Sequence, residues 1–86
     1  SVHYMRIMMN SQTILMVQEL SPIMISENGP YTGSVYEVSR INGTQFEVAL
    51  VKLPERDCMV LATKTWTGSV EDAVCKDDRL IIQYNK

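Results

Sequence analysis

The chain has 86 residues and a mass of 9.8 kDa, with 45% hydrophobic and 21% charged side chains. This composition is typical of one globular domain over residues 1–86, and it excludes disorder as the main state. A net charge of -2 argues against a dedicated duplex-DNA binder. The longest uninterrupted apolar run, Ile14 to Val17, is far shorter than the roughly 20 residues of a membrane span.

The first third of the chain is predicted to be mostly extended. Residues 4–9 form a short apolar run, and the contiguous apolar residues of 13–20 suit a strand covered on both faces. Helix formers are frequent in both runs, so a helix is the alternative there. Residues 23–25 form a third extended piece, and residues 26–33 carry the glycines and proline of a loop. We expect residues 1–4 to fray, or to be partly foreign to the natural chain.

The clearest element is a hairpin around Asn42-Gly43, which lies between the two β-rich runs 35–41 and 44–53. A two-residue turn would set charged side chains opposite apolar ones. A three-residue loop instead pairs Val38 with Phe46, and it gathers the apolar side chains on one face. We therefore predict the three-residue loop, formed by residues 41–43.

After a turn at Pro54, residues 58–66 are predicted to form the next strand. The spacing of Ser69 and Asp72 then fits a helix capping box, and an apolar stripe at helical spacing begins at Val70. These features predict one short helix over residues 69–77.

Residues 79–84 are predicted to form the closing strand. The fold class that follows is α+β: a curved antiparallel sheet of five or six strands, with the short helix before the last strand. A small, partly open barrel is the near alternative.

No constellation of catalytic or metal-binding residues is recognisable. His3 is the sole histidine and lies beside the N-terminus, where chains fray. The paired acids between residues 71 and 78 are explained as the start and end of the predicted helix. Glycine-rich phosphate loops are absent from the sequence. We therefore predict a protein that is not an enzyme and holds no cofactor and no metal.

The two cysteines, Cys58 and Cys75, are too few for a disulfide-dense scaffold and lack the paired spacing of a zinc site. We expect Cys58 to pack as a small hydrophobe and Cys75 to be a solvent-accessible thiol, whose reactivity the sequence leaves open. No secretory leader is recognisable. These observations predict a reduced, cytoplasmic protein without a membrane segment.

Five of the six methionines lie within the first 24 residues. Methionine fills irregular gaps in cores, which is the simpler interpretation, and it is also frequent on surfaces that bind other proteins. The alternative is an apolar face from Met5 to Met24 that covers a partner or a second copy of the chain.

By elimination, the sequence favours a small protein-binding module. Such a module would regulate or inhibit a larger protein by occlusion, and inhibitors encoded by phages against host or defence proteins are a class analogy. The predicted binding residues are Tyr31 in the predicted loop, Arg40 beside the hairpin tip, and Lys64 and Trp66 in the exposed segment that ends the predicted strand 58–66. The rival hypothesis is a single-stranded nucleic-acid binder that stacks bases on Trp66 and Tyr31 beside scattered Lys and Arg side chains.

Overall fold

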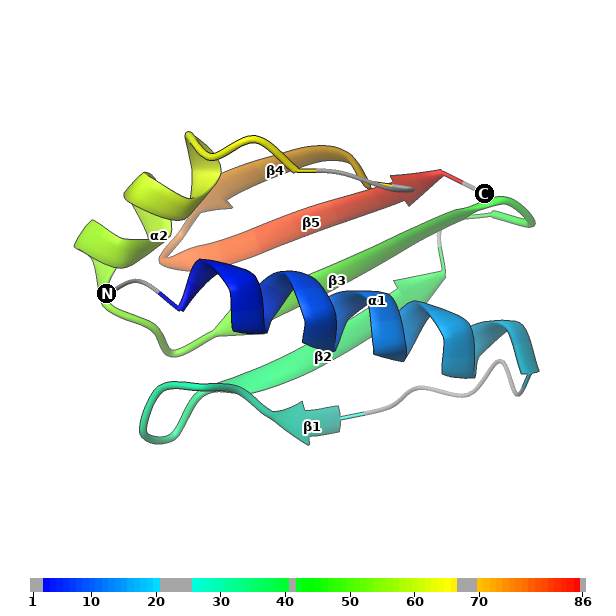
Figure 1. Ribbon diagram of the computed structural model, residues 1–86, viewed down its shortest axis with the longest axis horizontal. Helices are drawn as coiled ribbons and strands as arrows, with labels where there is room; N and C mark the ends of the chain where they lie inside the picture. Colours follow the sequence, from blue (N-terminus) through cyan, green and yellow to red (C-terminus); the bar gives the residue numbers. More distant parts are fainter. Residues whose placement is uncertain (1–2, 21–25, 41, 67–69, 86) are drawn as a thin grey trace.

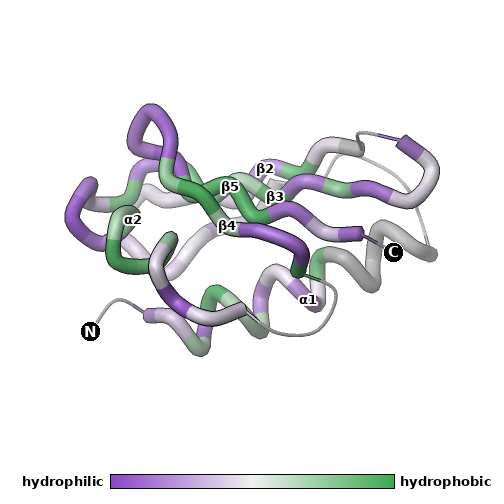
Figure 2. Tube along the Cα trace, turned by 90° about the horizontal axis from the view of Figure 1, so that it is seen from above, coloured by the Kyte–Doolittle hydropathy of each residue, from purple (hydrophilic) through white to green (hydrophobic). Residues whose placement is uncertain are grey.

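The computed structural model describes residues 3–20, 26–40, 42–66 and 70–85, with all their side chains except those of 15–20, 26, 27 and 40 (Figure 1). The strands form one open antiparallel sheet in the order β1-β2-β3-β5-β4, and the two helices lie on the same side of it (Figure 2). The predicted α+β class with an antiparallel sheet is confirmed. Among the described residues, the first and last strands of the sheet, β1 and β4, each pair on one side only, so the sheet is not the partly open barrel named as the alternative.

Helix α1 (Tyr4–Leu20) replaces the two strands predicted for residues 4–9 and 13–20. Among the side chains that the structure describes in α1, those of Ile7, Ser11 and Ile14 are buried against the sheet. Their spacing of four and three residues places them on one face of a helix. The contiguous apolar run hid this period, because Met5 and Met9 are apolar but lie on the exposed face.

The predicted hairpin is confirmed as β2 (Val35–Arg40) and β3 (Gln45–Val51), but its predicted register is wrong. Val38 pairs with Val48 instead of Phe46. The side-chain oxygen of Asn42 accepts the backbone N–H of Gln45 at 2.9 Å, which moves the turn towards the C-terminal arm. This shift of two residues keeps the apolar side chains on one face, since side chains alternate along a strand.

Strand β1 (Ser26–Asn28) pairs with β2 and takes the first three residues of the loop predicted for 26–33. The extended piece predicted for residues 23–25 lies outside the described residues. The chain then turns between Gly29 and Ser34, where the Gly29 N–H donates to the Ser34 carbonyl at 2.8 Å.

Helix α2 (Glu55–Ala62) replaces much of the strand predicted for residues 58–66. Pro54 stands immediately before the helix, and Glu55 and Asp57 occupy its first turn, where acidic side chains favour the helix dipole. Cys58 and Leu61 are fully buried, three residues apart on one face. The residues interpreted as a turn are therefore the start of a helix.

Strand β4 (Val70–Lys76) replaces the helix predicted for residues 69–77, and β5 (Arg79–Asn85) confirms the closing strand. Asp77 and Asp78 join the two strands with φ angles of 53° and 59°, which is the backbone of a two-residue hairpin turn. Ala73 faces the core while Val74 is 36% exposed. The supposed helical stripe therefore divides between the two faces of a strand.

The core lies between the helices and one face of the sheet. Its buried side chains from the strands are Tyr36, Val38, Phe46, Val48, Leu50, Ala73, Leu80, Ile82 and Tyr84. The opposite face carries no described helix, and we call it the open face. An ion pair crosses it: the Arg79 guanidinium of β5 lies 3.1 Å from the Glu37 carboxylate of β2, with β3 between them.

Candidate functional site

Four rings gather where the start of α1 meets the segment after α2. They come from three separate parts of the chain, and we call them the aromatic end: His3, Tyr4, Tyr31 and Trp66. All four are partly buried. The start of α1 and the loop between β1 and β2, which carries Tyr31, lie at the end of the molecule opposite the β2–β3 hairpin tip (Figure 1).

Tyr4 and Trp66 are the centre of this cluster. Their rings meet edge to face with centroids 5.3 Å apart, a favourable geometry for aromatic pairs. The Trp66 indole N–H donates to the carbonyl of Leu61 at 3.1 Å, and the Tyr4 hydroxyl donates to the carbonyl of Thr65. The Lys64 ammonium lies 5.8 Å from the centroid of the Tyr4 ring, within cation–π range. These contacts fix the segment after α2 against the first turn of α1.

Tyr31 is held by its own loop and by two neighbouring elements. Its backbone N–H donates to the Ser34 hydroxyl oxygen at 2.9 Å, and that hydroxyl donates to the Tyr31 carbonyl at 2.8 Å. The His3 ring meets the Tyr31 ring edge on, with centroids 5.0 Å apart. Burial raises the pKa of the Tyr31 hydroxyl, and its hydrogen bond with Asp57 of α2 raises the pKa further.

A glycine makes this loop possible. A Cβ atom on Gly29 would lie 2.4 Å from the Ser34 hydroxyl oxygen and 2.6 Å from Cδ1 of Leu50. Real Cβ contacts are essentially never that short, so a larger residue would displace Ser34. Because Ser34 holds the Tyr31 backbone, Gly29 indirectly positions the Tyr31 ring.

The structure brings together three of the four predicted binding residues. Tyr31, Lys64 and Trp66 all belong to the aromatic end or contact it. Arg40 ends β2 beside the hairpin tip, at the other end of the molecule, and its side chain lies outside the described residues (Figure 1).

The sequence did not indicate Tyr4 or His3 as part of this cluster. We expected His3 to fray, but its ring contacts Tyr31. A helix starting at Tyr4 would have been the signal, and it was hidden by the strand interpretation of residues 4–9.

Both helices expose large apolar side chains to solvent. Met5 and Met9 of α1 are 63% and 65% exposed, and Met59 of α2 is 59% exposed. These three methionines are therefore surface residues and do not fill the core, contrary to the simpler interpretation of the methionine content. Met16 and Met24 lie outside the side chains that the structure describes.

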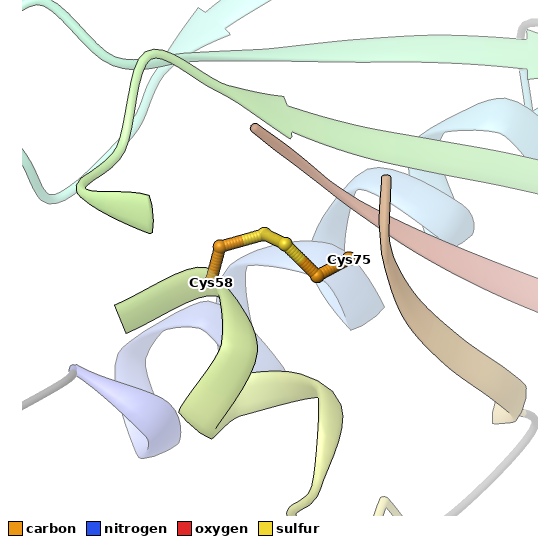
Figure 3. The surroundings of a disulfide bond; sticks show 2 residues. All are labelled: Cys58 and Cys75. Atoms are coloured by element: carbon orange, nitrogen blue, oxygen red, sulfur yellow. A yellow bond between two sulfur atoms is a disulfide. The ribbon is translucent and has the colours of Figure 1, made fainter. Parts of the chain in front are cut away.

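A disulfide fixes α2 on the sheet. Cys58 of α2 is bonded to Cys75 of β4, 17 residues later, and the bond reaches from the helix to the edge strand (Figure 3). The expected free thiol at Cys75 is therefore wrong. Sequence spacing gave no sign of the pairing, because the elements that bring the two cysteines together were themselves assigned wrongly.

Comparisons with known proteins add no family to this picture: neither protein-family models, curated proteins nor solved structures gave a match. Within the ranges that the structure describes, no helix is long and apolar enough to cross a membrane.

Proposed function

We propose that this chain is a small protein-docking module that binds a larger protein through its helix layer, at the aromatic end. The observation that carries the proposal is that the fixed Tyr4–Trp66 pair joins the start of α1 to the segment after α2, and that both of these helices expose methionines. Aromatic side chains held in one geometry lose little entropy on binding, and they dominate the energetics of many interfaces. Methionine adapts its shape to an apolar partner surface.

The charges at the aromatic end suggest the chemistry of the partner. Lys64 is exposed and lies over the Tyr4 ring, whereas Asp57 is engaged with Tyr31. An apolar partner surface with an acidic residue opposite Lys64 fits this arrangement best. A binding protein of this kind regulates its partner by covering the surface on which it docks, without a reaction of its own.

A disulfide between Cys58 and Cys75 favours an oxidising compartment, because cytosolic thiols are normally kept reduced. We therefore propose that the chain binds its partner in an oxidising compartment. The cysteine count had instead predicted the cytoplasm. The analogy with phage inhibitors remains a prediction from class alone.

The rival hypothesis, single-strand binding, needs a groove of one charge sign beside stacked rings. Lys64 and Asp57 carry opposite charges at the aromatic end, and the Trp66 ring already packs against Tyr4. These contacts favour the docking of a protein.

Photo-crosslinking tests the proposal. A photoreactive amino acid is placed at Met5 or Met59 on the helix layer, and at Ser39 on the open face as a matched exposed control. We expect the two helix positions to give the same protein adduct in host material, before and after nuclease treatment, and the Ser39 variant to give none. An adduct confined to Ser39, or capture that disappears with nuclease, would contradict the proposal.

Affinity measurements with the captured partner then test the residues. Trp66→Ala and Tyr31→Ala are each expected to weaken binding at least tenfold, which is about 1.4 kcal/mol. Lys64→Glu is expected to weaken binding while costing the free protein no more than the roughly 0.5–1 kcal/mol of one exposed cation–π contact, because Lys64 is exposed. If all three variants bind within tenfold of the native chain, the aromatic end is not the docking surface.

A further inference from the structure

Within the part of the chain that the structure describes, strand β4 is a long edge of the sheet and pairs only with β5. The strand order places it last, and it has seven residues, against three in β1 at the opposite edge (Figure 1). An edge strand presents unpaired backbone N–H and C=O groups that can pair with another strand. Proteins commonly block such edges. The side chains of β4 and its outward-pointing backbone groups therefore decide which strand can pair with it.

The hairpin register shows which backbone groups of β4 point outward. Lys76 pairs with Arg79 across the two-residue turn, and hydrogen-bonded and non-hydrogen-bonded pairs alternate from there. Ala73 and Cys75 therefore direct their N–H and C=O groups away from β5. In agreement, the Ala73 N–H donates to the carboxylate of Asp72 at 2.9 Å.

The side chains of β4 on the open face are Asp72, Val74 and Lys76, at alternate positions. All three are exposed, and Val74 is one of the few large apolar side chains that are. An acid, an apolar residue and a base in this order are self-complementary when the strand is reversed. Val74 at the centre then meets its own copy, and the acid at one end meets the base at the other.

We propose that β4 pairs antiparallel with β4 of a second copy of this chain, about a two-fold axis at Val74. Asp72 then faces Lys76 of the second copy, twice by symmetry, and the outward groups of Ala73 pair with those of Cys75 of the second copy. In the dimer, the hydrogen bond from the Ala73 N–H to the Asp72 carboxylate is replaced by an ion pair between that carboxylate and the Lys76 ammonium group of the second copy. The cross-strand charge pairs favour this register.

Other registers lose this complementarity. A shift of two residues either way places Val74 opposite Asp72 or Lys76 of the second copy, and the charges are left without opposite partners. The irregular pairing between Val70 and Asp72 ends the regular strand on the N-terminal side. The ladder therefore covers residues 72–76.

The proposed pairing also extends an apolar row across the open face. Ala49 pairs with Ile81, and Ile81 pairs with Val74. With Val74 on the two-fold axis, this row continues into the second copy. The interface is small, so we expect a dimer that forms reversibly as concentration rises.

Charge-reversal variants test the register. In Asp72→Lys, two basic residues of one copy face two basic residues of the other, and in Lys76→Asp two acidic residues face two acidic ones. Sedimentation velocity over roughly a hundredfold range of concentration should show the native chain dimerising, and each variant doing so at least about tenfold more weakly. An equimolar mixture of the two variants should form a heterodimer, detected by native mass spectrometry.

The mixture serves as its own folding control, because only folded strands can restore the pairing. The double variant Asp72→Lys with Lys76→Asp should dimerise like the native chain. A native chain that stays monomeric throughout the series would overturn the proposal. So would a native dimer that both single variants leave unchanged, since the contact would then lie elsewhere, for example on the methionines of α1.

Discussion

The disulfide between Cys58 and Cys75 should supply a large part of the stability of this small domain. The two cysteines are 17 residues apart, and closing a loop of that length removes entropy from the unfolded chain worth about 3 kcal/mol. Domains of this size are stable by only about 5–15 kcal/mol in total. Reduction should therefore lower the free energy of unfolding by about 3 kcal/mol.

Urea unfolding of the oxidised and reduced protein measures this effect on the same chain. Trp66 is the only tryptophan, and it lies just after α2, so its fluorescence reports whether α2 stays on the sheet. The double variant Cys58→Ala with Cys75→Ala should match the reduced protein and should no longer respond to reductant. If reduction lowers the free energy of unfolding by less than about 0.5 kcal/mol, the bond does not constrain the unfolded chain as argued.

Three further predictions test the helix, the core and the loop. Ile14→Ala should lower the free energy of unfolding by about 2–5 kcal/mol, because the side chain is buried. Met9→Ala, on the exposed face of α1, should change it by less than about 0.5 kcal/mol. Similar losses for the two variants in urea unfolding would contradict the assigned face of α1. Burial raises the pKa of Tyr84 from 10.0 to about 12. The stability that this raised pKa contributes to the folded state is therefore complete below pH 10 and is lost as the pH rises towards 12. Chemical denaturation across this range should show the free energy of unfolding falling, and Tyr84→Phe should make the fall smaller. Gly29→Ala should destabilise the chain by about 1–3 kcal/mol, whereas Gly43→Ala, where a Cβ has open space, should not; equal melting temperatures for the two variants would contradict the crowding at Gly29.

The sequence was most informative where a pattern had one structural meaning. Asn42-Gly43 between alternating residues gave the β2–β3 hairpin, and the apolar run after Asp78 gave β5. The register was predicted wrongly because the side chain of Asn42 moves the turn. The alternation of apolar and polar side chains does not reveal this, since a shift of the pairing by two residues leaves the alternation unchanged.

The helices were missed because short apolar runs suit either a buried strand or a buried helix. In α1, the exposed Met5 and Met9 stand on either side of the buried Ile7 and concealed the helical period. The sequence spacing of Ser69 and Asp72 imitated a capping box, although Asp72 belongs to strand β4 and the turn at Asp77 closes a hairpin.

The candidate site was predictable only in part. Trp66 and Tyr31 could be proposed as anchors because large aromatic residues beside loops often bind partners. Tyr4 could not, since its role depends on a helix start that meets Trp66 from the far end of the sequence. Contacts between such distant residues, including the disulfide, depend on the tertiary fold.

The most direct test of the docking account is crosslinking from both sides of the molecule in one experiment. Photoreactive residues at Met5 and Met59, on different helices of one layer, should yield one and the same partner protein, and the yield should fall at least tenfold when Trp66→Ala is added. The Ser39 control on the open face should give no such adduct. Different adducts from the two helices, or an undiminished yield with Trp66→Ala, would contradict the claim that the aromatic end anchors a protein partner.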